Sequence, residues 1–317
     1  MLTWPWKLKQ QGVMGINARN HRLIQPLNPR ARYPLVDNKR LTKQALEKWD
    51  IPTPPGIAVV EHHHDIRRID EQVAERNRFV IKPCNGSGGK GILVLIDRCD
   101  EGYVRPNGSH ISPTRLRGHL ANILSGLYSL TGRPDAALVE DCIDFTEHFE
   151  RFTHKGVPDL RVIVYRGYPL VAMMRLPTSS ADGKANLHQG AVGVGLDLST
   201  GQAIHACRGS RPCDRHPDTD APISELSVPQ WQQCLEHATR CYEMAGLGYF
   251  GADIVHDVDR GPVILELNAR PGLSIQLATD RGLSEYLAVI DDLPHDPLPS
   301  PKRRVELAQQ AQEDCFS

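Results

Sequence analysis

The sequence predicts an α+β fold, and three features of the chain lead to that class. Short β-rich runs at 79–83 and 92–96 flank a glycine-rich segment, and apolar runs at 251–256 and 262–268 flank a stretch of turn-forming residues. Segments with helical spacing of apolar residues occur elsewhere along the chain. Strands and helices do not alternate in regular βαβ units, so we expect α+β lobes and not a doubly wound sheet.

Four segments are predicted to be helices from the spacing of their apolar residues. They are residues 39–49, 65–78, 115–130 and 230–245. The first helix is expected to end at the Pro-rich turn 52–55. Two strands are predicted within 159–176, joined at Arg166-Gly167. Residues 17–32 contain four arginines among Asn and Pro, and we expect an ordered loop or connection there.

Composition limits the classes of function. The chain has 317 residues, 40% of them hydrophobic, and a net charge of -1, which gives no global basic field for nucleic acid. Eight cysteines occur without a C-x-x-C pair, so we expect reduced thiols and a cytoplasmic protein. The first fifteen residues are too short and polar for a signal peptide or a spanning helix. A peripheral membrane contact stays open.

The segment 251–272 predicts a metal-binding hairpin. Residues two apart on a strand share a face, so Glu266 and Asn268 project together, and the turn at 257–261 brings Asp253 beside them. Hard oxygen ligands suit Mg²⁺ or Mn²⁺ and do not suit zinc. A solvated carboxylate pair on a plain hairpin is the alternative interpretation.

The segment 79–91 predicts a phosphate-binding flap. A short strand delivers Lys82, and the glycines that follow allow the backbone to present NH groups to phosphate oxygens. The segment lacks G-x-x-x-x-G-K-[ST], and no helix follows, so it is neither a P-loop nor a dinucleotide fingerprint. A single glycine-rich loop is also compatible with an ordinary hairpin turn. The loop residues expected to contact phosphate are Ser87, Gly88 and Gly89.

In this order the segments resemble the ATP-grasp superfamily, and within it the alpha-L-glutamate ligase-like proteins related to the ribosomal-protein glutamate ligases. The resemblance implies two α+β lobes that clasp a nucleotide. It runs from about residue 36 to residue 279 and rests on six anchors. These are VDNK at 36–39 with IPTP at 51–54, the segment 79–91, LVEDCI at 138–143, DLR at 159–161, KANLHQG at 184–190 and ELNARPG at 266–272.

The resemblance implies a role for the residues in each anchor. It assigns ATP binding to Lys39, Lys82, Ser87, Gly88, Gly89, Glu140, Asp141, Cys142, Asp159, Lys184 and Asn186. It assigns the metal ions that bridge the phosphates to Asp253, Glu266 and Asn268. The candidates for holding a substrate carboxylate or a tetrahedral oxyanion are Arg161, Arg175 and Arg270, because the guanidinium fork matches a carboxylate.

The expected organisation has three parts. Residues 1–35 form an N-terminal extension, and 36–290 form the ATP-grasp domain, with a small ATP-binding lobe at about 79–140 and a large metal-binding lobe at about 141–290. Residues 291–317 form a Pro-rich tail that ends in a short helix or stays mobile. Many ATP-grasp enzymes carry a small domain before the lysine that corresponds to Lys39. This region is truncated here, so the resemblance does not identify the acceptor.

The resemblance implies an ATP-dependent carboxylate-amine ligase. It would join an amino acid, glutamate-like, to a peptide or small-molecule acceptor through an acyl phosphate, releasing ADP and phosphate. The alternatives are an ATP-grasp phosphotransferase acting on a hydroxyl and a non-catalytic nucleotide-binding regulator. The chain retains the expected ligands, which argues against a regulator with a degenerate site. These residues are Lys82, Asp159, Asp253, Glu266 and Asn268. The sequence does not give the oligomeric state.

Three other groups have a second interpretation. The run His62-His63-His64 lacks a second cluster at ligand spacing, so solvated histidines are favoured over a zinc site. The stretch of Arg208, Arg211 and Arg215 is expected to be an exposed loop, with contact to an acidic substrate as the alternative. Arg19 and His188 are balanced between a structural role and a site role.

Overall fold

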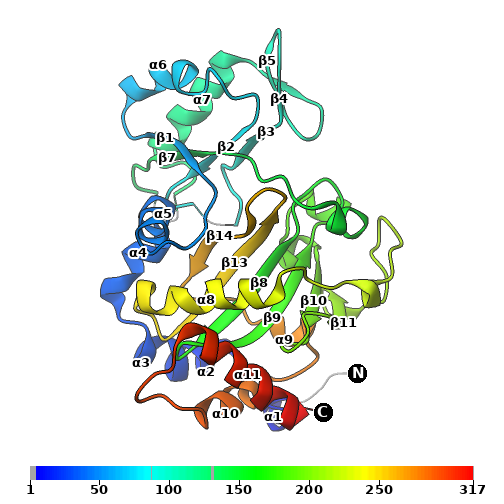
Figure 1. The fold of residues 1–317 in the computed structure, drawn as a ribbon. Coiled ribbons are helices and arrows are strands. Elements are labelled where there is room, and N and C mark those ends of the chain that lie inside the picture. Colours follow the sequence, from blue (N-terminus) through cyan, green and yellow to red (C-terminus); the bar gives the residue numbers. More distant parts are fainter. Residues whose placement is uncertain (1–4, 87, 130–131, 317) are drawn as a thin grey trace.

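The computed structural model describes residues 5–86, 88–129 and 132–316. It has two lobes, each built on its own antiparallel sheet (Figure 1). The buried apolar residues form two separate clusters, one in each lobe. No helix within the described residues combines the length and the apolar character that crossing a membrane requires.

The small lobe contains a four-stranded antiparallel sheet in the order β1-β7-β2-β3. Its strands are β1 Gly56–Val60, β2 Phe79–Pro83, β3 Leu93–Leu95 and β7 Ala137–Glu140. Helices α6 His63–Gln72 and α7 Pro113–Leu124 pack together over the sheet (Figure 1). A smaller sheet is formed by β4 Asp97–Cys99, β5 Gly102–Val104 and β6 His110–Ile111. The main sheet begins at Gly56, ahead of the range 79–140 expected for this lobe.

The large lobe contains a seven-stranded antiparallel sheet in the order β12-β11-β10-β9-β8-β13-β14. Its strands are β8 Asp159–Tyr165, β9 Tyr168–Leu176, β10 Val192–Leu196, β11 Ala203–Arg208, β12 Arg211–Pro212, β13 Tyr249–Asp257 and β14 Gly261–Asn268. The hairpin joined at Arg166-Gly167 and the hairpin with its turn after Asp257 both form as predicted. Both are local in sequence, so alternation and turn residues suffice to define them.

Helices complete the large lobe. They are α4 Tyr33–Asp37, α5 Lys39–Lys48, α8 Trp231–Ala245, α9 Ile275–Ala278, α10 Leu283–Asp291 and α11 Pro301–Phe316. Figure 1 shows α8 lying across the sheet, with α10 and α11 at the end of the molecule away from the small lobe. Leu46 of α5 belongs to the large-lobe cluster, so α5 packs with this lobe although it reaches the small one.

Two expectations about the chain ends need correction. Residues 16–27 are helical and not a loop, in the order α2 Ile16–Arg19, a π-helical segment Asn20–Ile24 and α3 Gln25–Leu27. Leu23 and Ile24 are buried in the large-lobe core, and this packing outweighs the poor helix propensity of the segment. Of the two alternatives for the C-terminal tail, the helix is confirmed: residues 301–316 form α11, and its Val305 and Ala308 are fully buried, which corrects only the expected end of the folded body. The folded body therefore continues past residue 290.

Two predicted helices end early. Helix α7 stops at Leu124 because Gly126 adopts a φ of +84°, and a Cβ there would lie 2.2 Å from the carbonyl oxygen of Arg133. Helix α6 stops at Gln72, where Nη2 of Arg98 donates a hydrogen bond to the carbonyl oxygen of Val73 at 2.6 Å. The end of α6 depends on Arg98, 25 residues from Val73, whereas the end of α7 depends on a nearby turn.

Candidate functional site

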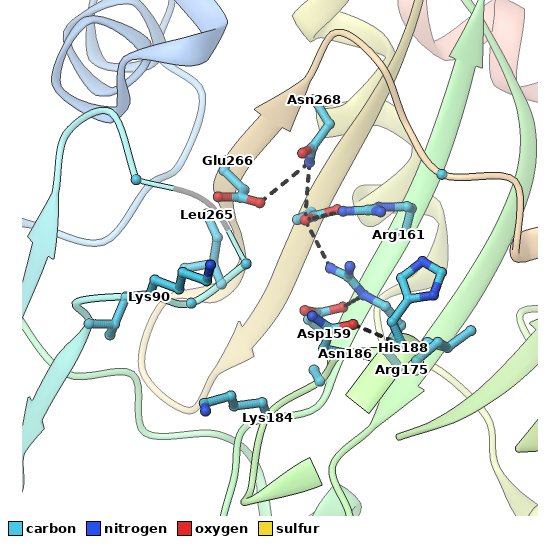
Figure 2. Close-up of a pocket in the computed structure, with 18 of the residues that line it drawn as sticks. Lys90, Asp159, Arg161, Arg175, Lys184, Asn186, His188, Leu265, Glu266 and Asn268 are labelled. Carbon is cyan, nitrogen blue, oxygen red and sulfur yellow. Dashed lines mark hydrogen bonds and ion pairs between the residues drawn. The ribbon is translucent and has the colours of Figure 1, made fainter. Parts of the chain in front are cut away.

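A cavity of about 470 Å³ is lined by residues of both lobes. The small lobe contributes the end of β2 and the glycine-rich loop, and the large lobe contributes β8, β9, β13, β14 and the loop at 184–188. Figure 2 shows Lys90 of the loop on one side of this space and Asp159, Arg161 and Arg175 of the large lobe on the other. The volume is within the range of small-molecule sites.

A buried carboxylate at the junction of the lobes positions two lysines, one from each lobe. Lys82 on β2 lies 2.6 Å from Oε2 of Glu140, and Lys43 on α5 lies 2.9 Å from Oε1. Glu140 is only 4% exposed. Burial alone would raise the pKa of Glu140, but the charges and hydrogen bonds of Lys82 and Lys43 outweigh it and lower the pKa. The carboxylate is therefore ionised and fixes both ammonium groups.

The glycine-rich loop presents open backbone to the cavity. Gly88 and Gly89 have φ values of +61° and +72°, which favour glycine. Apart from its chain neighbours, no atom of the described residues lies within 4 Å of the position a Cβ would take at Gly88. Lys39 Nζ donates to the carbonyl of Gly86 at 2.8 Å and lies 3.4 Å from Oε2 of Glu266. Lys39 thus links the loop to β14. Ser87 lies outside the described residues.

The β13–β14 hairpin brings the three expected oxygen ligands together. Register places Asp253 directly opposite Glu266. Asn268 Nδ2 lies 3.2 Å from Oδ2 of Asp253 and 3.5 Å from Oε1 of Glu266 (Figure 2). The two carboxylates and the amide therefore face the same space, as the alternation on β14 predicts.

Two arginines hold the Asp253 carboxylate. Arg161 Nε and Nη2 donate to its two oxygens at 2.7 and 2.6 Å, and Arg175 Nη2 lies 2.8 Å from Oδ2. Nε of Arg175 also donates to Asp159, its partner in the β8–β9 register. Burial opposes ionisation of Asp253, but the two guanidinium groups lower its pKa overall. Asp253 is therefore ionised.

Asp159 differs from Asp253 although both contact Arg175. Burial is the main cause that raises the pKa of Asp159, to about 7, and the negative charge of Asp253 acts in the same direction. Arg175 offsets only part of this effect because Asp253 shares its guanidinium. The pKa of Arg175 rises above its ordinary value because the attraction of the two carboxylates exceeds the effect of burial.

The donor set fits a hard divalent cation. Asp253 and Glu266 offer carboxylate oxygens, and Asn268 offers an amide oxygen, with no sulfur or imidazole at the centre of the set. Within the described residues no group of three or more His, Cys, Asp or Glu side chains is placed to hold a metal ion by itself. A cation held by few protein oxygens, with phosphate and water completing its shell, is the arrangement expected of Mg²⁺.

The loop around residue 186 forms the rim of the cavity. Lys184, Asn186 and His188 all line it. Oδ1 of Asn186 accepts from the backbone NH of His188 at 3.0 Å, which fixes the local turn. The ammonium of Lys184 is 46% exposed and lies 3.7 Å from Asp182, so it remains accessible to a ligand.

Four expected residues do not line the cavity. Asp141 pairs with two arginines at 3.2 Å, and Cys142 Sγ donates to the carbonyl of Leu95 at 3.4 Å. Burial raises the pKa of the Cys142 thiol to about 11. Arg270 lies 3.0 Å from Asp37, with its guanidinium over the Tyr33 ring. Glu140 is the fourth, and it acts on the site only through Lys82.

Lys90, which lines the cavity, and Lys43, which lies behind it on Glu140, were not among the expected ligands. Lys43 shares a helix face with Lys39 four residues earlier, and that spacing is a signal the sequence contains. Lys90 lines the cavity from the loop itself. The contact of Lys43 with Glu140 spans 97 residues, so sequence spacing does not reveal it.

Two antiparallel lobes that enclose a cavity lined by lysines, a glycine-rich loop and an acidic hairpin define an ATP-grasp protein. A family model described as sugar-transfer associated ATP-grasp matches residues 18–292. The chain belongs to this family. Comparison with curated proteins finds no match.

Solved structures share the fold at low sequence identity. D-alanyl-alanine synthetase A from Vibrio cholerae is 12% identical with a TM-score of 0.50, over 81% of this chain and 64% of that chain. D-alanine–D-alanine ligase from Bacillus anthracis complexed with ATP is 14% identical with a TM-score of 0.46, over 87% and 68%. The ATP-grasp ligase PsnB is 16% identical with a TM-score of 0.45, and the match covers 82% of this chain and 60% of that chain. The chain thus spans less than two thirds of the length of PsnB.

Proposed function

We propose that the protein is an ATP-dependent carboxylate-amine ligase that activates its substrate as an acyl phosphate. The observation that carries the proposal is the distribution of charge around one cavity. Lysines and glycine backbone face it from the small lobe, and an acidic hairpin with two arginines faces it from the large lobe. Phosphoryl transfer needs this combination because its catalysis depends on positioning and on charge stabilisation.

Lys82, Lys90 and Lys184 are proposed to bind the phosphates of ATP, together with the NH groups of the loop at 88–91 and with Lys39. Mg²⁺ or Mn²⁺ held by Asp253, Glu266 and Asn268 would neutralise charge on the phosphates. Asp159, whose carboxyl lies beside Arg175, is proposed to meet the ribose. Asp141 and Cys142 are proposed to contribute backbone at the hinge, with Glu140 before them.

A carboxylate is activated because phosphorylation converts its oxygen into a leaving group. The γ-phosphoryl bond to ADP breaks as the carboxylate oxygen bonds to phosphorus. The amine then attacks the carbonyl, and phosphate leaves with the former carboxylate oxygen as the amide forms. Arg161 and Arg175 are proposed to stabilise the oxyanion of this second step, since charge-assisted hydrogen bonds are stronger than neutral ones. Arg270, paired with Asp37, lies outside the cavity.

A glutamate-like amino acid and a peptide or small-molecule acceptor are the proposed substrates. The cavity is lined by more Lys and Arg than Asp and Glu side chains, which favours an acidic substrate. Localisation in the cytoplasm, with reduced cysteines, is part of the same proposal. A phosphotransferase acting on a hydroxyl and a non-catalytic regulator are the competing functions that the test must separate.

The test is interception of the acyl phosphate by hydroxylamine. ADP release and hydroxamate formation are measured together over a panel of amino acids and short peptides, with glutamate included. A ligase gives both products only with the correct carboxylate and a divalent cation. Glu266→Gln should abolish both, whereas Glu71→Gln, on the exposed face of α6, should not. A stable phosphorylated product without hydroxamate would establish a kinase instead, and ATP binding without ADP release over the whole panel would establish a regulator.

A further inference from the structure

The first 36 residues of the chain are basic without any acidic residue. They contain six Lys or Arg and no Asp or Glu, whereas the whole chain has a net charge of -1. The acidic excess therefore belongs to the remaining residues. The six cations are Lys7, Lys9, Arg19, Arg22, Arg30 and Arg32.

These cations are left without carboxylate partners in the structure. None of the six forms an ion pair with an Asp or Glu among residues 5–86, 88–129 and 132–316. Lys7, Lys9 and Arg22 are exposed, and Arg19 is bound to the Asn20 side chain and to the carbonyl of Pro271 at 2.7 Å. Exposed positive charge without carboxylate partners attracts an anionic surface.

Large apolar side chains are exposed between the cations. Trp6 is 55% exposed and Ile16 is 63% exposed, and Leu8 is also exposed. Trp6, Lys7, Leu8 and Lys9 are consecutive exposed residues of α1 Pro5–Gln10, so apolar and basic side chains both project from this short helix. The Lys7 ammonium lies 5.6 Å from the centre of the Trp6 ring. Aromatic and aliphatic groups beside lysines are typical of segments that lie in a membrane interface.

The segment is held on the folded body. The NH of Met14 donates to Oε1 of Gln276 at 2.8 Å, and the amide of Gln276 returns a hydrogen bond to the carbonyl of Met14 at 3.1 Å. The NH of Ser284 donates to the carbonyl of Gly12 at 3.0 Å. Figure 1 shows α1, α2 and α3 along the end of the large lobe that faces away from the small lobe. Docking there leaves the cavity between the lobes free.

We propose that this end of the molecule docks onto an anionic lipid bilayer. The docking region is the N-terminal segment 6–22, with Lys7, Lys9 and Arg22 as its exposed cations and Trp6, Leu8 and Ile16 as its exposed apolar side chains. Charge complementarity selects an anionic occupant. The exposed aliphatic side chains of Leu8 and Ile16 select a bilayer over a nucleic acid, because a bilayer has an apolar interior that can bury them. The proposal is independent of the reaction catalysed.

The test is cosedimentation of the purified protein with vesicles at low and high salt. One set contains phosphatidylcholine alone, and the other contains equal amounts of phosphatidylcholine and phosphatidylglycerol. We expect binding to the second set only, weakening as salt rises. Lys7→Gln with Lys9→Gln should lower the partition coefficient roughly 30-fold, because each cation near an anionic surface contributes about a fivefold effect. Trp6→Ala should also weaken binding.

The matched control removes two charges elsewhere. Arg67 and Arg68 are exposed on α6 in the small lobe, so Arg67→Gln with Arg68→Gln changes the net charge equally and should leave binding intact. Circular dichroism verifies that each variant folds. Equal loss in both double variants would show an unlocalised charge effect and overturn the proposal. Absence of binding, or retention on an acidic peptide or nucleic acid without retention on vesicles, would also overturn it.

Discussion

Replacing Glu140 by glutamine should destabilise the protein strongly because two cations lose their shared counter-charge. The side chains of Glu140, Lys43 and Lys82 are 5%, 8% and 14% exposed, so water screens them little. Removing one partner of a buried ion pair costs about 3–5 kcal/mol. Because glutamine keeps one acceptor oxygen, we expect a loss of about 3 kcal/mol in the free energy of unfolding.

A double-mutant cycle measured by urea unfolding isolates the cause. Lys43→Met leaves Glu140 paired with Lys82 alone. The double variant Lys43→Met, Glu140→Gln removes the Lys43 ammonium together with the Glu140 carboxylate, so only Lys82 is left without its counter-charge. The double variant should therefore lose less than the sum of the single losses, by about 1 kcal/mol or more. Glu71→Gln, exposed on α6, is the control and should change stability by less than about 0.5 kcal/mol.

The pH dependence gives a second measurement of the same interaction. The folded-state pKa of Glu140 lies below its ordinary value of 4.5. The stabilisation is therefore fully present above pH 4.5 and is lost as the pH falls through the lower folded-state pKa. Glu140→Gln should remove this part of the acid sensitivity. A variant as stable as the parent, or single losses that simply add, would refute the role assigned to Glu140.

Three further predictions concern other parts of the molecule. Lys82→Met should weaken ATP binding about tenfold or more, measured by calorimetry, since a charge-assisted contact contributes about 1.5–3 kcal/mol, and unchanged affinity would place the nucleotide elsewhere. Gly167→Ala should lower the melting temperature, because φ is +86° and a Cβ would lie 2.2 Å from Nη1 of Arg304; a melting temperature equal to that of the parent would contradict the packing of α11. Neither ring nitrogen of the buried His237 has a hydrogen-bond partner among the described residues, and burial, aided by Arg240, lowers its pKa from 6.5 to about 4. Stability should therefore fall by up to about 3 kcal/mol as pH drops from 6.5 toward 4, and a His237→Gln variant with the same pH dependence as the parent would exclude His237 as the cause.

The sequence predicts those parts of the site that depend on local geometry. Glu266 and Asn268 share a face because they are two apart on a strand, and the turn after Asp257 returns the chain beside Asp253. The glycines after Lys82 likewise predict a loop from the local sequence alone. These features need only alternation and turn chemistry, so one sequence suffices to locate them.

The remaining parts depend on contacts between distant segments. Arg161 reaches Asp253 across 92 residues, and Lys43 reaches Glu140 across 97, so neither pairing follows from spacing. Residues 16–27 become helical because Leu23 and Ile24 are buried by the rest of the large lobe. Arg270 pairs with Asp37, 233 residues earlier. Tertiary contacts decided each of these cases, and local propensity did not.

The separation of the two apolar clusters has a consequence for cooperativity. The small-lobe cluster includes Phe79 and Leu116, and α5 packs with the large-lobe cluster through Leu46. A smaller core buries a smaller fraction of its surface, so we expect the small lobe to unfold locally at a lower free energy than the large lobe. Native-state hydrogen exchange should then show amides of β2 exchanging through a lower-energy opening than those of β8, and equal opening energies would indicate one cooperative unit. Because Lys43 on the large-lobe side holds Glu140 at the end of β7, a ligand that orders this junction would couple the unfolding of one lobe to that of the other.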